Sequence, residues 1–586
     1  MNYYTNETEW QWLFKNAVDW KNVLPLYYPK YPTEEGFESP EEVIKFLEEI
    51  LINTGDWAFK SLTPRATILD KVGPGTVENG RTIPNEHLKA TYNEATELGL
   101  YGLSLPKKYG GMELPPAIVS VLMGQVARAC TSTMTQISFF YAIADMVNRF
   151  GAEEDKERII PKIIAGEISG AMCLTEPGAG SDLGSLRTSA ELQPDGTYLL
   201  NGSKIFITNG GGGVQLVLAR IKGEPEGLKG ISMFLVEQEI PGKEGLNFKV
   251  VKNEEKMGLH GSFTTEILYE NSVGKLMGVK NLGFTYMLHL MNAARLACGI
   301  QSVGGIEAAL SYARNYAQER KQFGKPIAEL PLMKRNLEDF ETERDALRAL
   351  LMDTITYVDI FQKLDLKRAA TNDLTKEEEA LYQDSKIWVR KRTPLLKYYG
   401  TEAFTALSTK AIQVLGGYGF MKDYPVERIH RDSFAPLLYE GTSQIQALMA
   451  LKDLVKYAMG EPKKFFANIF FKHPTRDLLK GTSKWEKDFR EDHYNFKKKL
   501  VRMLLKKLNP PKNMSLLNPK KWVTEEKING LMENAETLCQ GLSYMETLRV
   551  LAAHANIDST RSDLFYRYRR LVIPRLESIY TDWSIR

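Results

Sequence analysis

Glu440 is the residue whose type and surroundings best suit acid–base chemistry. It follows Leu437-Leu-Tyr and precedes Gly441, and Thr442 or Ser443 can cap a helix that starts directly after it. A helix N-terminus offers unpaired N–H groups and positive potential. In an apolar loop the carboxylate is partly desolvated, which raises its pKa towards neutrality and suits a general base. The alternative for this residue alone is a surface acid that stabilises the helix dipole.

A glycine-rich loop, CLTEPGAGSD, runs from Cys173 to Asp182. One proline and two glycines keep it irregular, and Thr175 and Ser181 add short polar side chains. Its backbone N–H groups can bind a flat polar ring or a phosphate. Most loops of this composition are only turns, so the loop alone does not establish a site.

The segment NGSKIFITNG, residues 201–210, can supply an aromatic ring and a hydroxyl. Its Asn-Gly pair predicts a hairpin turn that leads into a short strand. Phe206 and Thr208 then share one face, where they can stack on a flavin-like ring and hydrogen-bond to it. Strand core is the simpler interpretation of this segment by itself.

The segment RKQFGKPI starts at Arg320, at the end of a long helical pattern. Gly324 and Pro326 in this segment predict the end of the helix. A basic residue in a last helical turn favours the helix dipole, which is the structural explanation. The functional one is that the planar guanidinium of Arg320 binds a pyrophosphate. A second glycine-rich segment, QVLGGYGF, begins at Gln413 and precedes Glu440.

The elements that position these residues fall into four parts. Helical spacing of apolar residues predicts an α-helical domain over residues 1–170. Short apolar runs between turn residues predict an antiparallel β-barrel or sandwich over residues 171–281. Helical patterns return over residues 282–459. Residues 460–586 form a basic extension that is helical from Glu525 to Tyr580. The expected class is an α+β multi-domain protein.

The composition is that of a soluble globular protein: 586 residues, 43% hydrophobic and 25% charged. Four separated cysteines, none in a CxxC pair, argue against a disulfide framework, and no His/Cys cluster predicts a metal site. No apolar run is long enough to span a membrane and the start does not read as a signal peptide, so we expect a cytoplasmic protein. Residues 461–521 hold 17 Lys and Arg against 6 Asp and Glu. This stretch is therefore much more positive than the whole chain, whose net charge is only +3.

Taken together and in this order, the segments CLTEPGAGSD, NGSKIFITNG, ERKQFGKPI, QVLGGYGF and YEGTSQIQ resemble the sequence blocks of the acyl-CoA dehydrogenase family. The segment GLYGLSLPKKYGGM, residues 99–112, is similar to the N-terminal signature of that family. The resemblance covers residues 40–458. It implies an N-terminal α-helical domain, a middle β domain and a C-terminal four-helix bundle, with FAD bound between the last two.

The resemblance also implies roles for single residues. Glu440 matches the usual catalytic base of the family. Some members carry the base at another position, which is Ala294 here, and the lack of an acid there strengthens the assignment to Glu440. Tyr439 and Gly441 flank that base, Arg295 orients their loop, and Ser181 also borders the substrate thioester. The implied FAD contacts are Leu174, Thr175, Gly180, Ser181, Phe206, Thr208, Arg320, Gln322, Phe323, Gln413, Gly416, Gly417, Thr442 and Gln444.

The implied reaction is the α,β-dehydrogenation of a fatty acyl-CoA to a trans-2-enoyl-CoA, with electrons passed to an electron-transfer flavoprotein. An acyl-CoA oxidase, which uses oxygen, is an alternative that the sequence does not separate. A DNA-binding alkylation-response relative is another, favoured by the basic stretch and opposed by the intact residues 439–442. Acyl chain length and branching stay open.

The basic extension carries an amphipathic pattern over residues 496–508. Phe496, Leu500, Met503, Leu504 and Leu508 share one helical face and six Lys or Arg residues the other. A helix of this kind can lie on an anionic membrane surface. A docked helix with a solvated basic face is the equal alternative. The extension itself favours a homodimer, because it can cover a surface that other members use for further subunit contacts.

Overall fold

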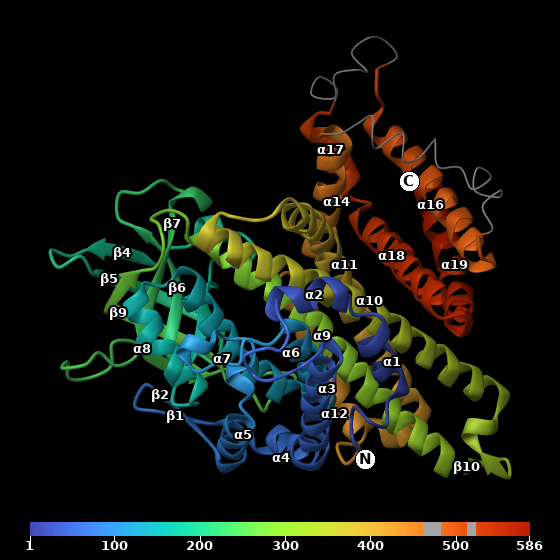
Figure 1. The fold of residues 1–586 in the computed structure, drawn as a ribbon, viewed down its shortest axis with the longest axis horizontal. Helices are drawn as coiled ribbons and strands as arrows, with labels where there is room; N and C mark the ends of the chain where they lie inside the picture. Colours follow the sequence, from blue (N-terminus) through green and yellow to red (C-terminus); the bar gives the residue numbers. More distant parts are fainter. Residues whose placement is uncertain (461–481, 512–522, 586) are drawn as a thin grey trace. The chain divides into compact units, whose positions relative to one another are not determined.

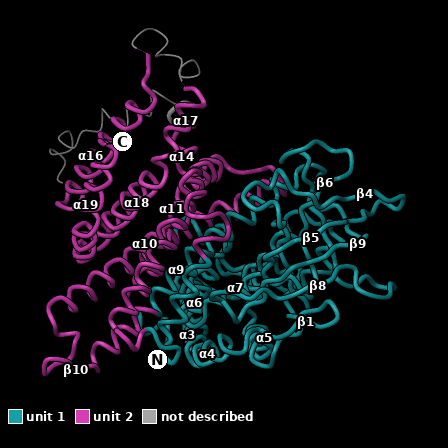
Figure 2. Tube along the Cα trace, turned by 180° about the vertical axis from the view of Figure 1, so that it is seen from behind, with its two compact units in different colours: residues 1–7, 21–308, 420–435 teal, residues 8–20, 309–419, 436–586 magenta. Residues whose placement is uncertain are grey.

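The computed structural model describes residues 1–460, 482–511 and 523–585 and divides the chain into two compact units. Unit 1 comprises residues 1–7, 21–308 and 420–435, and unit 2 comprises residues 8–20, 309–419 and 436–586 (Figure 2). The long helix α9 (Gly283–Glu319) begins in unit 1 and ends in unit 2. The units are therefore not consecutive stretches of sequence.

The helical part of unit 1 is built around α6 (Pro116–Ala129) and α7 (Thr131–Phe150). Every residue of 121–137 is buried, including polar residues such as Arg128 and Gln136. The helix α3 packs against α6, and α8 packs against α7. The further helices of this part are α2 (Trp20–Tyr27), α3 (Pro40–Trp57), α4 (Thr63–Val72), α5 (Glu86–Glu97), α8 (Glu153–Ile164) and α12 (Pro425–Asp432).

A seven-stranded sheet follows these helices in unit 1 (Figure 1). Its strand order is β3-β6-β4-β5-β9-β7, β8 pairs with β9, and β6 pairs also with β7, so the sheet closes on itself. The barrel-like β domain is thus confirmed, although β6 runs parallel to β3 and β4. The strands are β3 (Ser169–Cys173), β4 (Ser189–Leu192), β5 (Tyr198–Thr208), β6 (Gly213–Ile221), β7 (Ile231–Glu237), β8 (Lys249–Asn253) and β9 (Thr264–Leu276).

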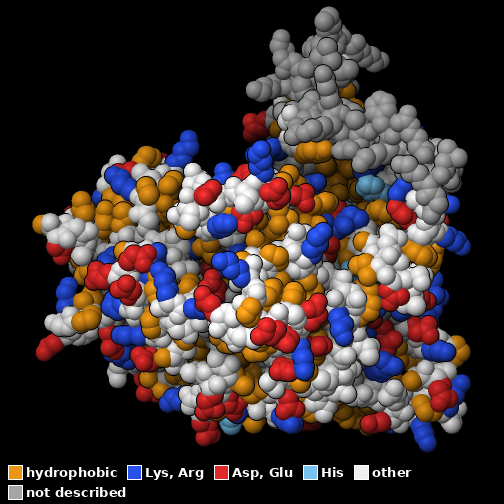
Figure 3. All heavy atoms as spheres, in the orientation of Figure 1, with side chains coloured by type: hydrophobic (Ala, Val, Ile, Leu, Met, Phe, Trp, Pro, Cys, Tyr) orange, Lys and Arg blue, Asp and Glu red, His pale blue; other side chains and the backbone are white. Residues whose placement is uncertain are grey.

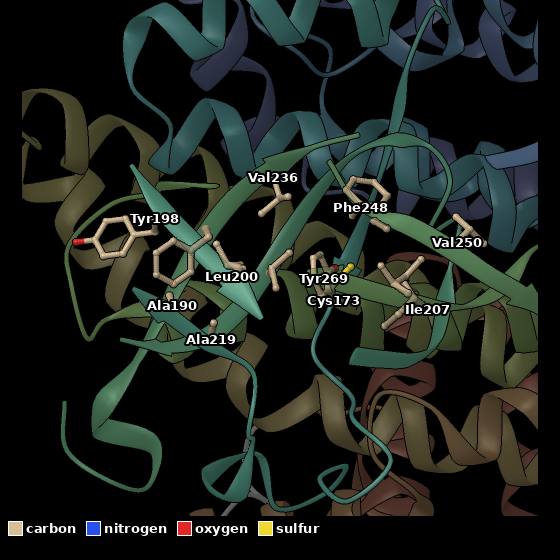
Figure 4. Close-up of a cluster of buried hydrophobic side chains, with 14 of the residues drawn as sticks. Cys173, Ala190, Tyr198, Leu200, Ile207, Ala219, Val236, Phe248, Val250 and Tyr269 are labelled. Atoms are coloured by element: carbon tan, nitrogen blue, oxygen red, sulfur yellow. The ribbon is translucent and has the colours of Figure 1, made fainter. Parts of the chain in front are cut away.

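The inner face of this sheet is filled by apolar side chains from all seven of its strands and from the loop before β8. Figure 4 shows Tyr198, Leu200, Val236, Phe248 and Tyr269 among them, all of them buried. Alternation along the strands places these side chains inward and leaves the intervening ones outside. A separate hairpin, β1 (Gly75–Glu78) with β2 (Arg81–Pro84), lies within the region that the sequence predicted to be helical.

The prediction of a hairpin turn at Asn201-Gly202 was wrong. These residues lie inside β5, where the pairing with β9 shifts register between Leu200 and Gly202. Gly202 has a φ of +150°, and an added Cβ would meet Thr188, so the glycine serves a β-bulge. The β4–β5 turn lies instead at residues 193–197.

Unit 2 is built on two long helices that pack along each other, α10 (Pro331–Thr371) and α11 (Lys376–Leu415). Asn372, at a φ of +50°, ends α10, and a capping box between Thr375 and Glu378 starts α11. The remaining elements are α1 (Thr8–Asn16), β10 (Lys321–Gln322), β11 (Lys325–Pro326), α13 (Phe434–Leu438), α14 (Ser443–Gly460), α16 (Lys484–Leu508), α17 (Glu525–Met532), α18 (Ala535–Ile557) and α19 (Ser562–Ile585).

The C-terminal extension is helical, as predicted, and α18 packs against α10, α11, α14 and α19. The amphipathic residues 496–508 belong to α16, whose apolar face is buried within unit 2. The Phe496 ring, for example, lies 6.0 Å from Trp583 and 6.3 Å from Tyr580. In this fold only the basic face of α16 remains for contact with a membrane surface. Much of the basic stretch 461–521 lies outside the described residues.

The four cysteines are free and buried. Within residues 1–460, 482–511 and 523–585, no helix is both long and apolar enough to cross a membrane. Over the same residues, no cluster of His, Cys, Asp and Glu could hold a metal ion. On the face in Figure 3, basic and acidic side chains are interspersed around small apolar areas.

Candidate active site

The first predicted segment, CLTEPGAGSD, is fixed in unit 1 by a buried ion pair. Glu176 accepts hydrogen bonds from Lys204 Nζ (2.8 Å), from the N–H groups of Arg187 (2.6 Å) and Thr188 (3.0 Å), and from Thr188 Oγ1 (2.5 Å). Lys204 is 0% exposed and also donates to the Leu174 carbonyl at 2.9 Å. Burial acts to raise the pKa of Glu176, but the Lys204 charge and these hydrogen bonds outweigh it and leave the pKa below its ordinary value.

The second segment lies beside the first because β5 contains another bulge. Pairing with β9 shifts between Lys204 and Ile207, and Phe206 has a left-handed φ of +60°. The N–H of Ile205 therefore donates to the Thr175 carbonyl at 2.9 Å instead of to β9. The same bulge turns Phe206 outward, where it is 62% exposed, while Ile207 is buried.

These contacts bring together the predicted flavin residues of unit 1. Gly180 and Ser181 are exposed and Thr175 is partly exposed, as is Thr208 next to the exposed Phe206 ring. The side chain of Leu174 is buried, so this residue can offer only its backbone to a ligand. Arg295, also in unit 1, is buried and donates to Asn292 Oδ1 at 2.9 Å.

The other predicted flavin residues lie in unit 2. Arg320 follows the end of α9, and Gln322 and Phe323 form part of the β10–β11 hairpin, where Phe323 is 89% exposed. The Arg320 guanidinium lies 5.9 Å from the centre of the Tyr418 ring. Among the described residues no carboxylate forms an ion pair with Arg320, so its guanidinium can take an anion. Gln413, Gly416 and Gly417 are exposed near the end of α11.

Glu440 lies in the loop between α13 and α14, as predicted, two residues before the helix cap Thr442. Thr442 Oγ1 accepts the N–H of Ile445 at 3.4 Å, which starts α14. Glu440 and Gly441 both have left-handed backbones, with φ of +58° and +90°. Such a conformation costs a residue with a Cβ about 1–2 kcal/mol, and strain of this kind concentrates at functional sites.

Two side chains of unit 2 hold the carbonyl groups of this loop. Lys397, on α11, donates from Nζ to the carbonyls of Gly441 (2.7 Å) and Leu437 (3.4 Å). Gln446, on α14, donates from Nε2 to the carbonyls of Glu440 (3.0 Å) and Gly441 (3.1 Å). Both side chains are fully buried, so the orientation of the loop backbone is fixed from inside the unit.

The residues around this loop have further partners. Ser443 Oγ donates to Glu402 Oε1 at 2.5 Å, and Gln444 Nε2 donates to Glu536 Oε1 of α18 at 2.8 Å. Gln444, a predicted flavin contact, is therefore tied to the C-terminal extension. Tyr439 and Thr442 are partly exposed beside Glu440.

The sequence did not single out Lys204, Lys397, Gln446 or Glu176 as site residues. Lys204 and Lys397 each stand alone in an apolar run, KIFI and LLKYY, which is the one local signal that such a lysine is buried. Their partners lie 28 and 44 residues away in the chain, and no local pattern identifies them.

The exposed groups fit the flavin that the sequence resemblance implies. Unit 1 presents an aromatic ring, hydroxyls and open backbone N–H groups, which suit a flat polar ring system. Unit 2 presents a guanidinium suited to a pyrophosphate. Space within 4 Å is empty where a Cβ would lie on Gly178, Gly416 and Gly417, so the backbone there is open to a ligand.

Three family models match consecutive parts of the chain. The acyl-CoA dehydrogenase N-terminal domain matches residues 57–167, the middle domain residues 171–272 and the C-terminal domain residues 281–455. An acyl-CoA dehydrogenase of Bacillus subtilis (strain 168) is 34% identical over 404 residues, which cover 68% of this chain and 95% of that protein.

Solved structures agree with these matches. Butyryl-CoA dehydrogenase from Megasphaera elsdenii superposes with a TM-score of 0.59 at 29% identity, covering 70% of this chain and 98% of that one. An acyl-CoA dehydrogenase from Bacillus anthracis, complexed with FAD, gives a TM-score of 0.75 at 22% identity over 98% of this chain and 91% of that one. That likeness concerns the fold, C-terminal extension included. From these matches, this chain belongs to the acyl-CoA dehydrogenase family of FAD-dependent oxidoreductases.

Proposed function

We propose that this protein oxidises a fatty acyl-CoA thioester to the trans-2-enoyl-CoA, in the manner of fatty acid β-oxidation, with Glu440 as the base. The observation that carries the proposal is the loop of Glu440. Glu440 has a strained, left-handed backbone conformation just before the cap of α14. The buried side chains of Lys397 and Gln446, in the same unit, donate hydrogen bonds to the carbonyl groups of its loop. A surface acid that merely stabilises a helix dipole needs no such support.

The reaction removes two hydrogens from neighbouring carbons. Glu440 takes the proton from the α-carbon of the thioester, and the electron pair of that C–H bond becomes part of the new C=C bond. Bound FAD would supply the acceptor for the hydride that leaves the β-carbon. Negative charge develops on the thioester oxygen as the α-proton leaves, and a hydrogen-bond donor is needed there. We assign this role to the main-chain N–H of Glu440.

Further residues of the proposed site act on binding. We assign contacts with the flavin ring to Leu174, Thr175, Gly180, Ser181, Phe206 and Thr208, and contacts with the rest of FAD to Arg320, Gln322, Phe323, Gln413, Gly416, Gly417, Thr442 and Gln444. The exposure of most of these groups supports the assignment. Ser181, Tyr439, Gly441 and Arg295 complete the site around the thioester and the base.

The substitution Glu440→Gln tests the proposal. It keeps the volume of the side chain and removes its basicity, so the purified variant should keep FAD but lose turnover by about 10²–10⁴-fold. The measurement is a panel of acyl-CoA thioesters with a dye as electron acceptor, followed by bleaching of the flavin. Near wild-type turnover by this variant would exclude Glu440 as the base.

The electron acceptor is proposed to be an electron-transfer flavoprotein. An acyl-CoA oxidase performs the same first half-reaction and passes electrons to oxygen instead. Activity with a dye or an electron-transfer flavoprotein under anaerobic conditions supports the dehydrogenase. Oxygen consumption at a comparable rate would establish the oxidase. Salt-sensitive duplex binding without thioester turnover would instead favour the DNA-binding branch.

A further inference from the structure

We propose that Lys397 and Gln446 are positioning residues for the catalytic base. The inference rests on the proposed function, since it gives a reason for the support around Glu440. Gln446 ends the segment YEGTSQIQ but received no role from the sequence, and Lys397 lies outside every segment assigned to the site. Both donate hydrogen bonds to main-chain carbonyl groups of the loop.

The geometry of the loop carries the argument. The backbone turns through two consecutive left-handed residues, Glu440 and Gly441, and this turn would relax if nothing held it. Lys397 Nζ and Gln446 Nε2 converge on the Gly441 carbonyl, at 2.7 Å and 3.1 Å. Each also binds one more loop carbonyl, that of Leu437 for Lys397 and that of Glu440 for Gln446. The two donors thereby fix the peptide planes on both sides of Gly441.

Burial makes the two donors rigid. Lys397 and Gln446 are both 0% exposed, so packing holds their side chains and water does not compete for the carbonyls. A Cβ on Gly441 would lie 2.9 Å from Gln446 Nε2, so the glycine permits this close contact. Supporting groups of this kind must hold a catalytic side chain to within about 0.5 Å. The position of the Glu440 side chain thus follows from its backbone, which the two donors hold.

The decisive variant is Lys397→Met, which keeps a long apolar stem and removes the donor. A misplacement of about 1 Å can cost about 10²-fold in rate, so we expect kcat to fall about 10- to 100-fold. KM for the acyl-CoA and the FAD content should stay within about twofold, because neither contact involves Lys397. Amide hydrogen exchange should accelerate in residues 437–446.

Arg392→Met is the matched control. Arg392 lies five residues earlier on α11, is equally buried, and pairs with Asp353 and Glu546 instead of with the loop. It should lose stability without a fall in kcat at a temperature where it is folded. Gln446→Met is a second test, because it removes a neutral donor to the same loop. We expect kcat to fall about 10-fold in this variant. It replaces Lys397→Met as the test if that variant does not fold.

The outcomes separate the two proposals. If Glu440→Gln is inactive but Lys397→Met and Gln446→Met match Arg392→Met in kcat and in exchange of the loop, the positioning role is wrong and the base stands. If Glu440→Gln keeps its turnover, the proposed function itself fails. A fall in kcat with unchanged KM and faster loop exchange, confined to the Lys397 and Gln446 variants, confirms the positioning role.

Discussion

At the scale of single residues, the candidate site depends on buried cations that bind backbone. Lys204 holds the carbonyl of Leu174 and the carboxylate of Glu176, as Lys397 holds the loop of Glu440. In both places a buried lysine side chain holds a loop that carries predicted site residues. Such groups are tolerated in the interior only when they are paired, so each marks a place where the loop conformation matters.

Removing Lys204 should destabilise unit 1 strongly. Lys204→Met leaves Glu176 buried without its counter-charge, which typically costs about 3–5 kcal/mol of the free energy of unfolding. The loop would then adjust, so FAD affinity should fall as well. Urea unfolding and titration with FAD measure the two effects.

The control for this prediction is Lys252→Met in β8. The Lys252 side chain pairs with Glu254 and Glu266 but is 52% exposed, whereas Lys204 is fully buried. Solvent screens the charge of an exposed lysine, so this variant should remain close to the wild type in stability. Equal losses for the two variants would mean that the buried pair in β5 has no special role.

At the scale of elements, the C-terminal extension supports the helices that carry the base. Ser543 of α18 donates to the Leu395 carbonyl of α11, at 3.3 Å, two residues before Lys397. Glu536 of the same helix accepts from Gln444 of α14. The extension thus contacts both helices that hold the loop of Glu440. Its division from the rest of the chain at residue 459, like the domain boundaries at 170 and 281, stays a prediction.

The helix α1 packs on this extension through an aromatic and ionic contact. Trp12 Nε1 donates to Asp558 Oδ2 at 3.2 Å, its ring lies 5.1 Å from that of His554, and Arg561 pairs with Glu9. Burial, together with the charges of Arg561 and Arg549, lowers the pKa of His554 to about 3. His554 is therefore neutral in the folded protein at ordinary pH.

The pKa of His554 predicts a loss of stability in acid. The unfolded chain takes up a proton near pH 6.5, and the folded protein does so only near pH 3, so the free energy of unfolding falls as the pH falls through this window. The slope for one such group is about 1.4 kcal/mol per pH unit. In His554→Gln this contribution disappears, as urea unfolding at several pH values can measure.

His87→Gln is the matched control, since the His87 side chain is 31% exposed in unit 1 and lies 3.7 Å from the exposed carboxylate of Glu86. Its pH dependence should match that of the wild type. If His554→Gln retains the full acid dependence, carboxylates and not this histidine account for it.

At the scale of the whole molecule, exposed apolar side chains point to association between copies of the chain. Phe323 is 89% and Leu332 71% exposed at and just after the β10–β11 hairpin, and large apolar side chains in such positions usually meet a partner. We propose a homodimer in which unit 2 contributes this hairpin.

Light scattering after size exclusion tests the dimer. The expected mass is twice that of the 66.4 kDa chain, and it should persist on dilution. Leu332→Lys places a charge at an exposed apolar position and should shift the mass towards that of one chain. A monomeric wild type would contradict the prediction.

The sequence by itself determined the order of the helical and β regions, though not the β1–β2 hairpin, and it determined the helix cap after Glu440 and the end of α9 before Arg320. Apolar periodicity and turn residues are local properties, so they can be read without the fold. Only the tertiary structure decided that Lys397 and Gln446 hold the Glu440 loop, that Phe206 faces outward from a bulge, that α1 packs on helices more than 500 residues away, and that α16 buries its apolar face. These features depend on which distant segments pack together, and burial of apolar surface across the chain, not local propensity, selects those partners.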